Sequence, residues 1–196
     1  MRDHIFNHFK EASDLIIQSA DSLSAPIADA IEIMSSALIR GNKILSCGNG
    51  GSAADAQHFS SELMGRFERE RNPFPSIALT TDTAFMTAVS NDYDFDMIFS
   101  RQIQALGHVG DVLLALSTSG NSNNVIAAVE AAHKVGMHIV ALIGREGGEL
   151  GTKLNTDDCR IQVTHTRTAR IQEMHGLIIH CICDGIDNKL CELAKH

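Results

Sequence analysis

An apolar run leads directly into a glycine-rich loop at Lys43-Ile44-Leu45-Ser46-Cys47-Gly48-Asn49-Gly50-Gly51-Ser52. The first five residues have the length and composition of a buried β-strand, and a helical pattern over Ser52–Phe67 follows the loop. A strand, a tight loop and a helix in succession form the first half of the βαβ unit from which parallel sheets are built. This stretch therefore predicts an α/β fold.

The same alternation continues to the end of the chain. Further strands are predicted at Ser76–Leu79, Asp111–Leu116, His138–Ile143 and Arg160–Val163, and further helices at Thr83–Ser90, Asp94–Leu106, Val125–Val135 and Thr168–Ala194. Residues 1–40 read as two helices, from about Asp3 to Leu23 and from Pro26 onward. We therefore predict one domain over residues 1–196: a three-layer α/β sandwich of about five parallel strands, with helices on both faces and two N-terminal helices.

Composition narrows the class of protein. The chain has 196 residues, 44% of them apolar, and a net charge of −8, which argues against a nucleic-acid-binding surface. No uninterrupted apolar stretch approaches the roughly 20 residues that span a bilayer, and the N-terminus lacks the apolar core of a signal peptide. Five scattered cysteines resemble neither a disulfide framework nor a zinc site. We expect a cytoplasmic protein with no membrane or nucleic-acid partner and with free thiols.

Two predicted strands end in loops suited to an anion. One is Gly48–Ser52, and the other is Ser117-Thr118-Ser119-Gly120-Asn121-Ser122, which also opens a helix. Unpaired backbone N–H groups and the helix dipole favour a negative charge at a helix N-terminus, and ligands in parallel sheets bind beyond the carboxyl ends of the strands. The two loops predict a site for a phosphate ester.

Other interpretations of these loops are weaker. The second loop alone could be an N-cap cluster. The first also fits a weak dinucleotide fingerprint, Gly48-x-Gly50-x-x-Ala53, but no acidic residue follows at the end of the next strand: Glu68 and Glu70 precede that strand. The nucleoside triphosphatase motif is absent from the sequence. A small phosphorylated molecule fits better than a dinucleotide.

Two predicted helices carry residues capable of proton transfer or metal binding. His58 and Glu62 lie one turn apart on the first, and Gln172 and His180 lie within roughly 80° of one another around the last. A histidine and a glutamate in this arrangement form an acid/base pair or bind a metal. The alternatives are a surface hydrogen bond for His58 and Glu62, and a core histidine for His180 among apolar neighbours.

In combination, these motifs resemble the sugar isomerase (SIS) domain family, and within it the bacterial phosphoheptose isomerases. The matching stretches are Leu45–Ser52, Asp55–Phe59 with Glu62, Asn91-Asp92, Gly110–Ser122 and Ala169–His175. The resemblance implies isomerisation of sedoheptulose 7-phosphate to D-glycero-D-manno-heptose 7-phosphate through an enediol, the first step toward the ADP-heptose of lipopolysaccharide core. It also implies a homotetramer with active sites between subunits, in which residues 1–40 contribute to the interface, and one zinc ion per subunit.

The resemblance also implies roles for individual residues. Glu62 is the implied base that moves a proton between C1 and C2, and His180 is the implied acid that serves the oxygens. The implied zinc ligands are His58, Glu62, Gln172 and His180. The implied substrate contacts are Asn49, Gly50, Gly51, Ser52, Glu62, Asn91, Asp92, Ser117, Thr118, Ser119, Ser122 and Gln172. The chain departs from some members at Ala169, where they carry Asp, and Ala169 has no implied catalytic role.

A second function remains open at this stage. A branch of the same fold acts as a non-catalytic tetrameric adaptor for the bacterial replication initiator protein. Such adaptors lack the base, the acid or both, whereas this chain has both Glu62 and His180. The sequence therefore favours the enzyme over the adaptor.

Overall fold

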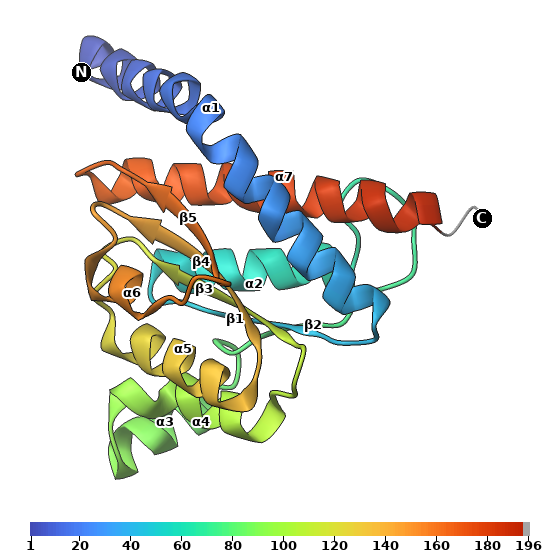
Figure 1. Cartoon of the computed structure of the whole chain (residues 1–196). Helices are drawn as coiled ribbons and strands as arrows, with labels where there is room; N and C mark the ends of the chain where they lie inside the picture. The colour runs from blue at the N-terminus through green and yellow to red at the C-terminus, as the bar shows by residue number, and fades with distance from the viewer. Residues whose placement is uncertain (194–196) are drawn as a thin grey trace.

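The computed structural model describes residues 1–193, and Figure 1 shows its three layers. The strands are β1 Ile44–Cys47, β2 Ser76–Ala78, β3 Val112–Ser117, β4 His138–Gly144 and β5 Cys159–Val163. The helices are α1 Arg2–Ile39, α2 Gly51–Met64, α3 Thr83–Asp92, the 3₁₀ turn η1 Phe95–Met97, α4 Ile98–Leu106, α5 Asn123–Val135, α6 Gly148–Lys153 and α7 Thr168–Leu193. The predicted end of the last helix, at Ala194, lies outside the described residues.

All five strands are parallel, in the order β2-β1-β3-β4-β5. From β1 the chain runs through α2 to β2 on one side, and it then returns past β1 to form β3 on the other side. The connection that leaves β1, toward β2, and the connection that leaves β3, toward β4, therefore run in opposite directions from two neighbouring strands. In open α/β sheets, ligands bind at this kind of reversal, beyond the carboxyl ends of the strands.

Each face of the sheet contributes to its own hydrophobic core. In β3, Val112, Leu114 and Leu116 pack with α1, α2 and α7, while Leu113 and Ala115 pack with α3, α4, α5 and α6. Every residue of β3 is buried. Burial on both faces is typical of parallel sheets, and it explains why these strands read as continuous apolar runs. The predicted three-layer α/β fold is confirmed.

The prediction of two N-terminal helices is wrong, because α1 is one helix of 38 residues that contains Pro26. Proline removes one backbone hydrogen bond, to the carbonyl of Ser22, which is exposed to water. Leu23 and Met34, on either side of the proline, belong to the same buried cluster as α7. Packing of this shared apolar face therefore outweighs the local break, and Figure 1 shows that α1 bends along its length.

Two smaller differences concern short segments. The helix predicted from Asp94 begins with η1, since the Asp94 carboxylate accepts a hydrogen bond from the Asp96 backbone N–H at 2.8 Å. The six-residue helix α6 is absent from the prediction, because it carries only one buried apolar residue, Leu150, and hence no periodic pattern. Among the described residues all five cysteines are free, as predicted.

Helix α1 is long and apolar enough, by length and composition, to cross a membrane, with a mean hydropathy of 1.3 over 18 residues. One such helix is weak evidence, since a core helix of a soluble protein passes the same test. A third of that window, 33%, is buried inside the structure. The absence of a membrane partner therefore stays a prediction.

An acidic side chain fastens the two central strands at the edge of the sheet opposite the loops. The buried Asp111 carboxylate accepts hydrogen bonds from the backbone N–H groups of Lys43, at 3.0 Å, and His108, at 2.8 Å, and pairs with the Lys43 ammonium. Burial raises the pKa of Asp111, but the hydrogen bonds from Lys43, His108 and Asn42 outweigh burial and lower that pKa overall.

Asp111→Asn keeps the shape of this side chain and removes its charge. We expect the free energy of unfolding at pH 7 to fall by about 2 kcal/mol, as for hydrogen bonds to a charged group. Because the folded pKa lies below the unfolded one, the wild-type advantage is present above the unfolded pKa and disappears as pH falls through the folded pKa. Urea unfolding at pH 7 and in strong acid measures both effects, and equal stabilities at pH 7 would contradict the assignment.

Candidate active site

The two predicted anion loops lie side by side, because β1 and β3 are paired neighbours. A reciprocal pair of hydrogen bonds joins them: Asn49 Nδ2 donates to Asn124 Oδ1 at 2.7 Å, and Asn124 Nδ2 donates to Asn49 Oδ1 at 2.9 Å. Asn124 is 1% exposed. The sequence analysis missed Asn124, although a polar amide within the first turn of an otherwise apolar helix was a usable signal.

Hydroxyl groups converge inside the loop between β3 and α5. Ser117 Oγ lies 3.2 Å from Ser122 Oγ and accepts a hydrogen bond from the Gly120 backbone N–H at 3.1 Å. Ser119 Oγ accepts from the Asn121 backbone N–H at 3.1 Å. Thr118 and Ser119 are half-buried, and Ser122 is the N-cap of α5 without capping it through its side chain. The loop is thus ordered by its own hydroxyl groups and surrounds the N-terminus of α5.

The segment after β4 packs against the loop between β3 and α5. The Gly120 carbonyl accepts a hydrogen bond from the Leu150 N–H at 2.8 Å, and Asn121 Oδ1 accepts from the Glu149 N–H at 2.9 Å. Gly120 has φ +68°, and a Cβ atom there would overlap the Gly147 carbonyl. The backbones of the two loops therefore touch directly, which only glycine permits at this position.

The loop after β1 is equally close-packed. Gly50 has φ +56°, Ser52 is 3% exposed, and a Cβ atom at Gly51 would overlap the amide of Gln172 on α7. Gln172 therefore lies over the start of α2, at the anion loop. The sequence prediction used only the rotational angle between Gln172 and His180, whereas eight residues also separate them by about 12 Å along the helix axis. The structure does not bring Gln172 beside His180 within one chain.

The other three candidate metal and acid/base residues do come together. His58 Nε2 lies 3.2 Å from Glu62 Oε1 and 3.4 Å from His180 Nε2, with the two imidazole rings edge to face. Phe67 stands beside His180, with ring centroids 5.6 Å apart. His180 is exposed rather than in the core. A carboxylate and two imidazoles thus meet where α2 faces α7, in contact with solvent.

These distances fit part of a zinc site. Two ligand atoms on one tetrahedral zinc ion lie about 3.3 Å apart when each bond is about 2.0–2.1 Å long. The pairs His58–Glu62 and His58–His180 both have this separation. Across residues 1–193, however, no three His, Cys, Asp or Glu side chains form a complete metal-binding group. The chain supplies two ligand pairs that share His58, and Gln172 does not complete them.

A second histidine of α7 shows the contrast with His180. His175 is fully buried, and burial lowers its pKa to about 4. Its ring is therefore neutral near pH 7. The core-histidine alternative considered for His180 is realised instead by His175.

Two predicted substrate contacts lie apart from the loops. Asn91 and Asp92 are exposed at the end of α3, where Asn91 Nδ2 donates to Asp92 Oδ1 at 2.7 Å. The nearest link toward the loop after β3 is Asp96, which accepts from Asn123 Nδ2 at 3.1 Å. Asn91 and Asp92 therefore stand on the segment that approaches the site from the α3 side.

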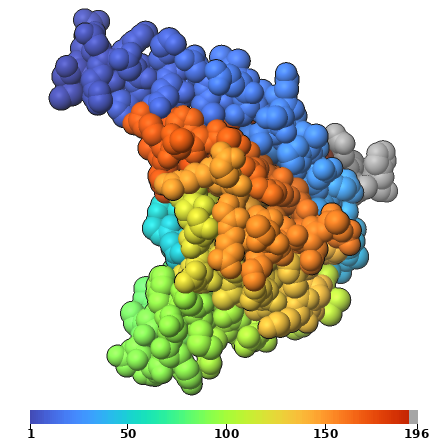
Figure 2. Space-filling view, turned by 60° about the vertical axis from the view of Figure 1, so that its left-hand side comes forward, coloured from blue at the N-terminus to red at the C-terminus, as the bar shows by residue number. Residues whose placement is uncertain are grey.

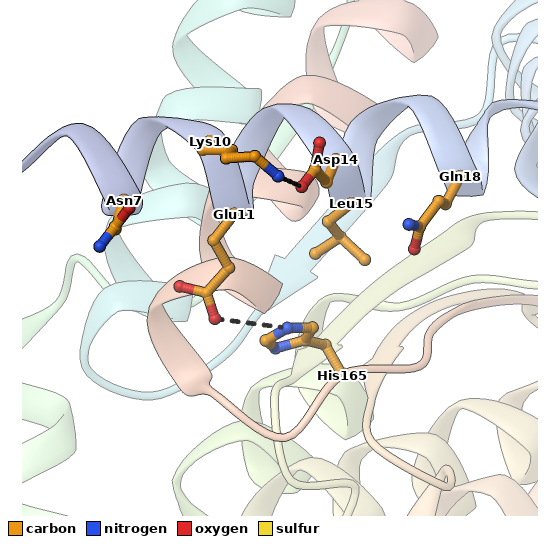
Figure 3. A pocket seen from close by; sticks show the side chains of 7 residues that line it. All are labelled: Asn7, Lys10, Glu11, Asp14, Leu15, Gln18 and His165. Carbon is orange, nitrogen blue, oxygen red and sulfur yellow. Dashed lines mark hydrogen bonds and ion pairs between the residues drawn. The ribbon is translucent and has the colours of Figure 1, made fainter.

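Another hollow, of 330 Å³, lies between α1 and the loop that precedes α7 (Figure 3). Its charged groups are paired: Lys10 with Asp14 at 2.9 Å, and Glu11 with His165 at 3.8 Å and with Arg167. None of the predicted site residues lines it. The region beyond the carboxyl ends of β1 and β3 is therefore the better candidate for the active site.

Comparison with known proteins identifies the family of the chain. The model of the SIS domain family matches residues 7–144. A curated relative, "Phosphoheptose isomerase" of Methylibium petroleiphilum, is 55% identical over 190 residues, which cover 97% of this chain and 95% of the relative.

Solved structures agree in fold over the same length. That of a phosphoheptose isomerase from Neisseria gonorrhoeae is 49% identical, with a TM-score of 0.91 over 95% of this chain and 98% of the other. That of a phosphoheptose isomerase from Francisella tularensis is 47% identical, with a TM-score of 0.92 over 95% and 97%. The chain belongs to the SIS domain family and, within it, to the phosphoheptose isomerases.

Proposed function

We propose that the chain converts sedoheptulose 7-phosphate to D-glycero-D-manno-heptose 7-phosphate. The observation that carries the proposal is that Glu62 and His58, on the helix that leaves an anion loop, meet His180 of α7. His58 lies seven residues after Gly51, about 10 Å further along α2. A ligand that reaches from the loops to this group needs several carbon atoms between its phosphate and its carbonyl, as a heptose phosphate has.

The phosphate binds at the two loops. The hydroxyls of Ser52, Ser117, Thr118, Ser119 and Ser122 and the N-termini of α2 and α5 offer donors without formal positive charge. Asn49, Gly50, Gly51 and Gln172 contact the sugar from the first loop and α7, and Asn91 and Asp92 contact it from the α3 side.

Proton transfer follows from the chemistry of an α-hydroxy ketone. The Glu62 carboxylate removes a proton from C1 while the electrons move to the C2 carbonyl oxygen, and an enediolate forms, the anion of the enediol. His180 moves a proton from the oxygen on C1 to the oxygen on C2, and Glu62 returns its proton to C2 to give the aldose. His58, between the two, orients both side chains.

A zinc ion bound by His58, Glu62 and His180 would supply Lewis-acid stabilisation of negative charge on the substrate oxygens. Gln172 is part of the proposed ligand set, but its amide lies at the loop in this chain, so it would have to rearrange to be the fourth ligand. The two ligand-pair distances support the proposal.

The chain acts as a cytoplasmic homotetramer, with α1 in the interface. Large apolar side chains on the N-terminal half of α1 are exposed to solvent: Ile5 50%, Phe6 66%, Phe9 74% and Ile17 72%. Figure 2 shows this half as an arm that extends beyond the rest of the molecule. Contiguous exposed apolar groups mark interaction surfaces.

The product supplies heptose for lipopolysaccharide core, and no nucleic acid or membrane takes part. No described contact favours the adaptor alternative.

Glu62→Gln tests the reaction. It preserves the side chain's shape and removes the proton acceptor, so kcat should fall by about 10² to 10⁴. Production of aldose phosphate from sedoheptulose 7-phosphate, followed by NMR, gives the rate. Glu70→Gln, on the exposed loop after α2, is the control and should retain wild-type kcat. More than half of wild-type kcat in Glu62→Gln would exclude Glu62 as the base.

Metal analysis tests the zinc proposal. The purified protein should contain about one zinc per chain, lose it together with activity on chelation, and regain both when zinc is added. His58→Ala should lose zinc, whereas His138→Ala, at the opposite edge of the sheet, should keep it. Full activity in protein shown to be metal-free would exclude the Lewis-acid role.

Sedimentation velocity tests assembly. The wild type should sediment as a tetramer at micromolar concentration, and the double variant Phe6→Glu/Phe9→Glu should dissociate, because it places charge on the apolar face of α1. Val109→Glu, at an equally exposed position away from the N-terminal half of α1, is the control. A stable, active wild-type monomer is the result that would overturn the proposal.

A further inference from the structure

A buried arginine joins the end of α2 to α7. Arg71 lies in the loop between α2 and β2, and its side chain is 5% exposed. Its Nε donates to Asp187 Oδ1 at 2.7 Å, its Nη2 to the Glu62 carbonyl at 2.8 Å and its Nη1 to the Leu63 carbonyl at 2.9 Å. One rigid guanidinium thus binds both helices at once.

The two carbonyls explain why an arginine stands here. Glu62 and Leu63 are in the last turn of α2, where backbone carbonyls have no partner within the helix. A cation at a helix C-terminus also interacts favourably with the dipole. Arg71 therefore fixes the backbone of Glu62, the residue that supplies the proposed base. The Glu62 carboxylate itself contacts His58.

Asp187, the partner of Arg71, lies on the same helix as His180, the proposed acid. It follows His180 by seven residues, two turns of α7, so the two side chains share a helix face about 10 Å apart along the axis. The helices are thus joined at two points, His58 to His180 and Arg71 to Asp187. Between them Cys183 is fully buried, and burial raises its pKa to about 12, so its thiol remains neutral.

We propose that Arg71 and Asp187 are positioning residues for catalysis: their ion pair fixes the last turn of α2 on α7 and thereby sets the distance between Glu62 and His180. The inference rests on the isomerase function proposed above. A buried ion pair contributes little net stability compared with apolar packing, because both charges lose their hydration. Its directional geometry is the property that apolar side chains would not reproduce.

Asp187→Asn, compared with Asp111→Asn, separates positioning from stability. Both substitutions remove a buried carboxylate that is paired with a cation, but Asp111 lies at the opposite edge of the sheet. We expect kcat of Asp187→Asn to fall by about 10-fold to 100-fold, as when supporting groups of an active site are removed. KM should stay within about twofold, because the anion loops are intact. Asp111→Asn should lose stability and keep wild-type kcat.

Variants of Arg71 provide the second measurement. Arg71→Met should lower kcat as Asp187→Asn does, and Arg71→Lys, which keeps the charge but not the fork, should recover part of it. If Asp187→Asn does not fold at the assay temperature, Arg71→Lys carries the comparison. Wild-type kcat in the folded variants, despite reduced thermal stability, would overturn the inference. An inactive wild type would instead overturn the proposed function.

Discussion

The pairing of β1 with β3 is the contact on which the site depends. Both strands are buried on both faces, so the polar groups at their ends can be placed only at the two edges of the sheet. At the carboxyl edge the chain leaves β1 toward one helical layer and β3 toward the other, which opens a space between them. Asn49 and Asn124 bridge that space, and the N-termini of α2 and α5 both face it.

Helix α7 connects the anion loops with the group formed by His58, Glu62 and His180. Near its start, Gln172 lies on the loop after β1; two turns on, His180 meets His58; two turns further, Asp187 binds Arg71. A single rigid element therefore sets the separation between the proposed phosphate site and the proposed site of proton transfer. Helix α2 runs alongside it from the same loop. In the proposed function, the length of the substrate is therefore matched by the rise of two helices.

Local patterns explain what could be predicted from the sequence. The strand ends, both anion loops and the pairing of His58 with Glu62 depend on residues close in the chain, so periodicity and turn chemistry were sufficient. Pro26 led to the wrong prediction of two N-terminal helices, because its effect is decided by packing of α1 on α7. Asn124 was missed because its partner is 75 residues away. Gln172 was grouped with His180 from the resemblance and from the angle between them around the helix, and that angle carries no information on their separation along the helix axis.

The backbone contact between Gly120 and the Gly147 region also affects how the protein can diversify. An insertion into the turn after β4 would push directly on the loop after β3, so these two loops can change length only together. The segment from Gly65 to Pro75 is bound through Phe67, Arg69, Arg71 and Phe74, and it leaves most of its other residues exposed. New sequence is therefore tolerated more easily beside the exposed Glu70 than at the support of the anion loop.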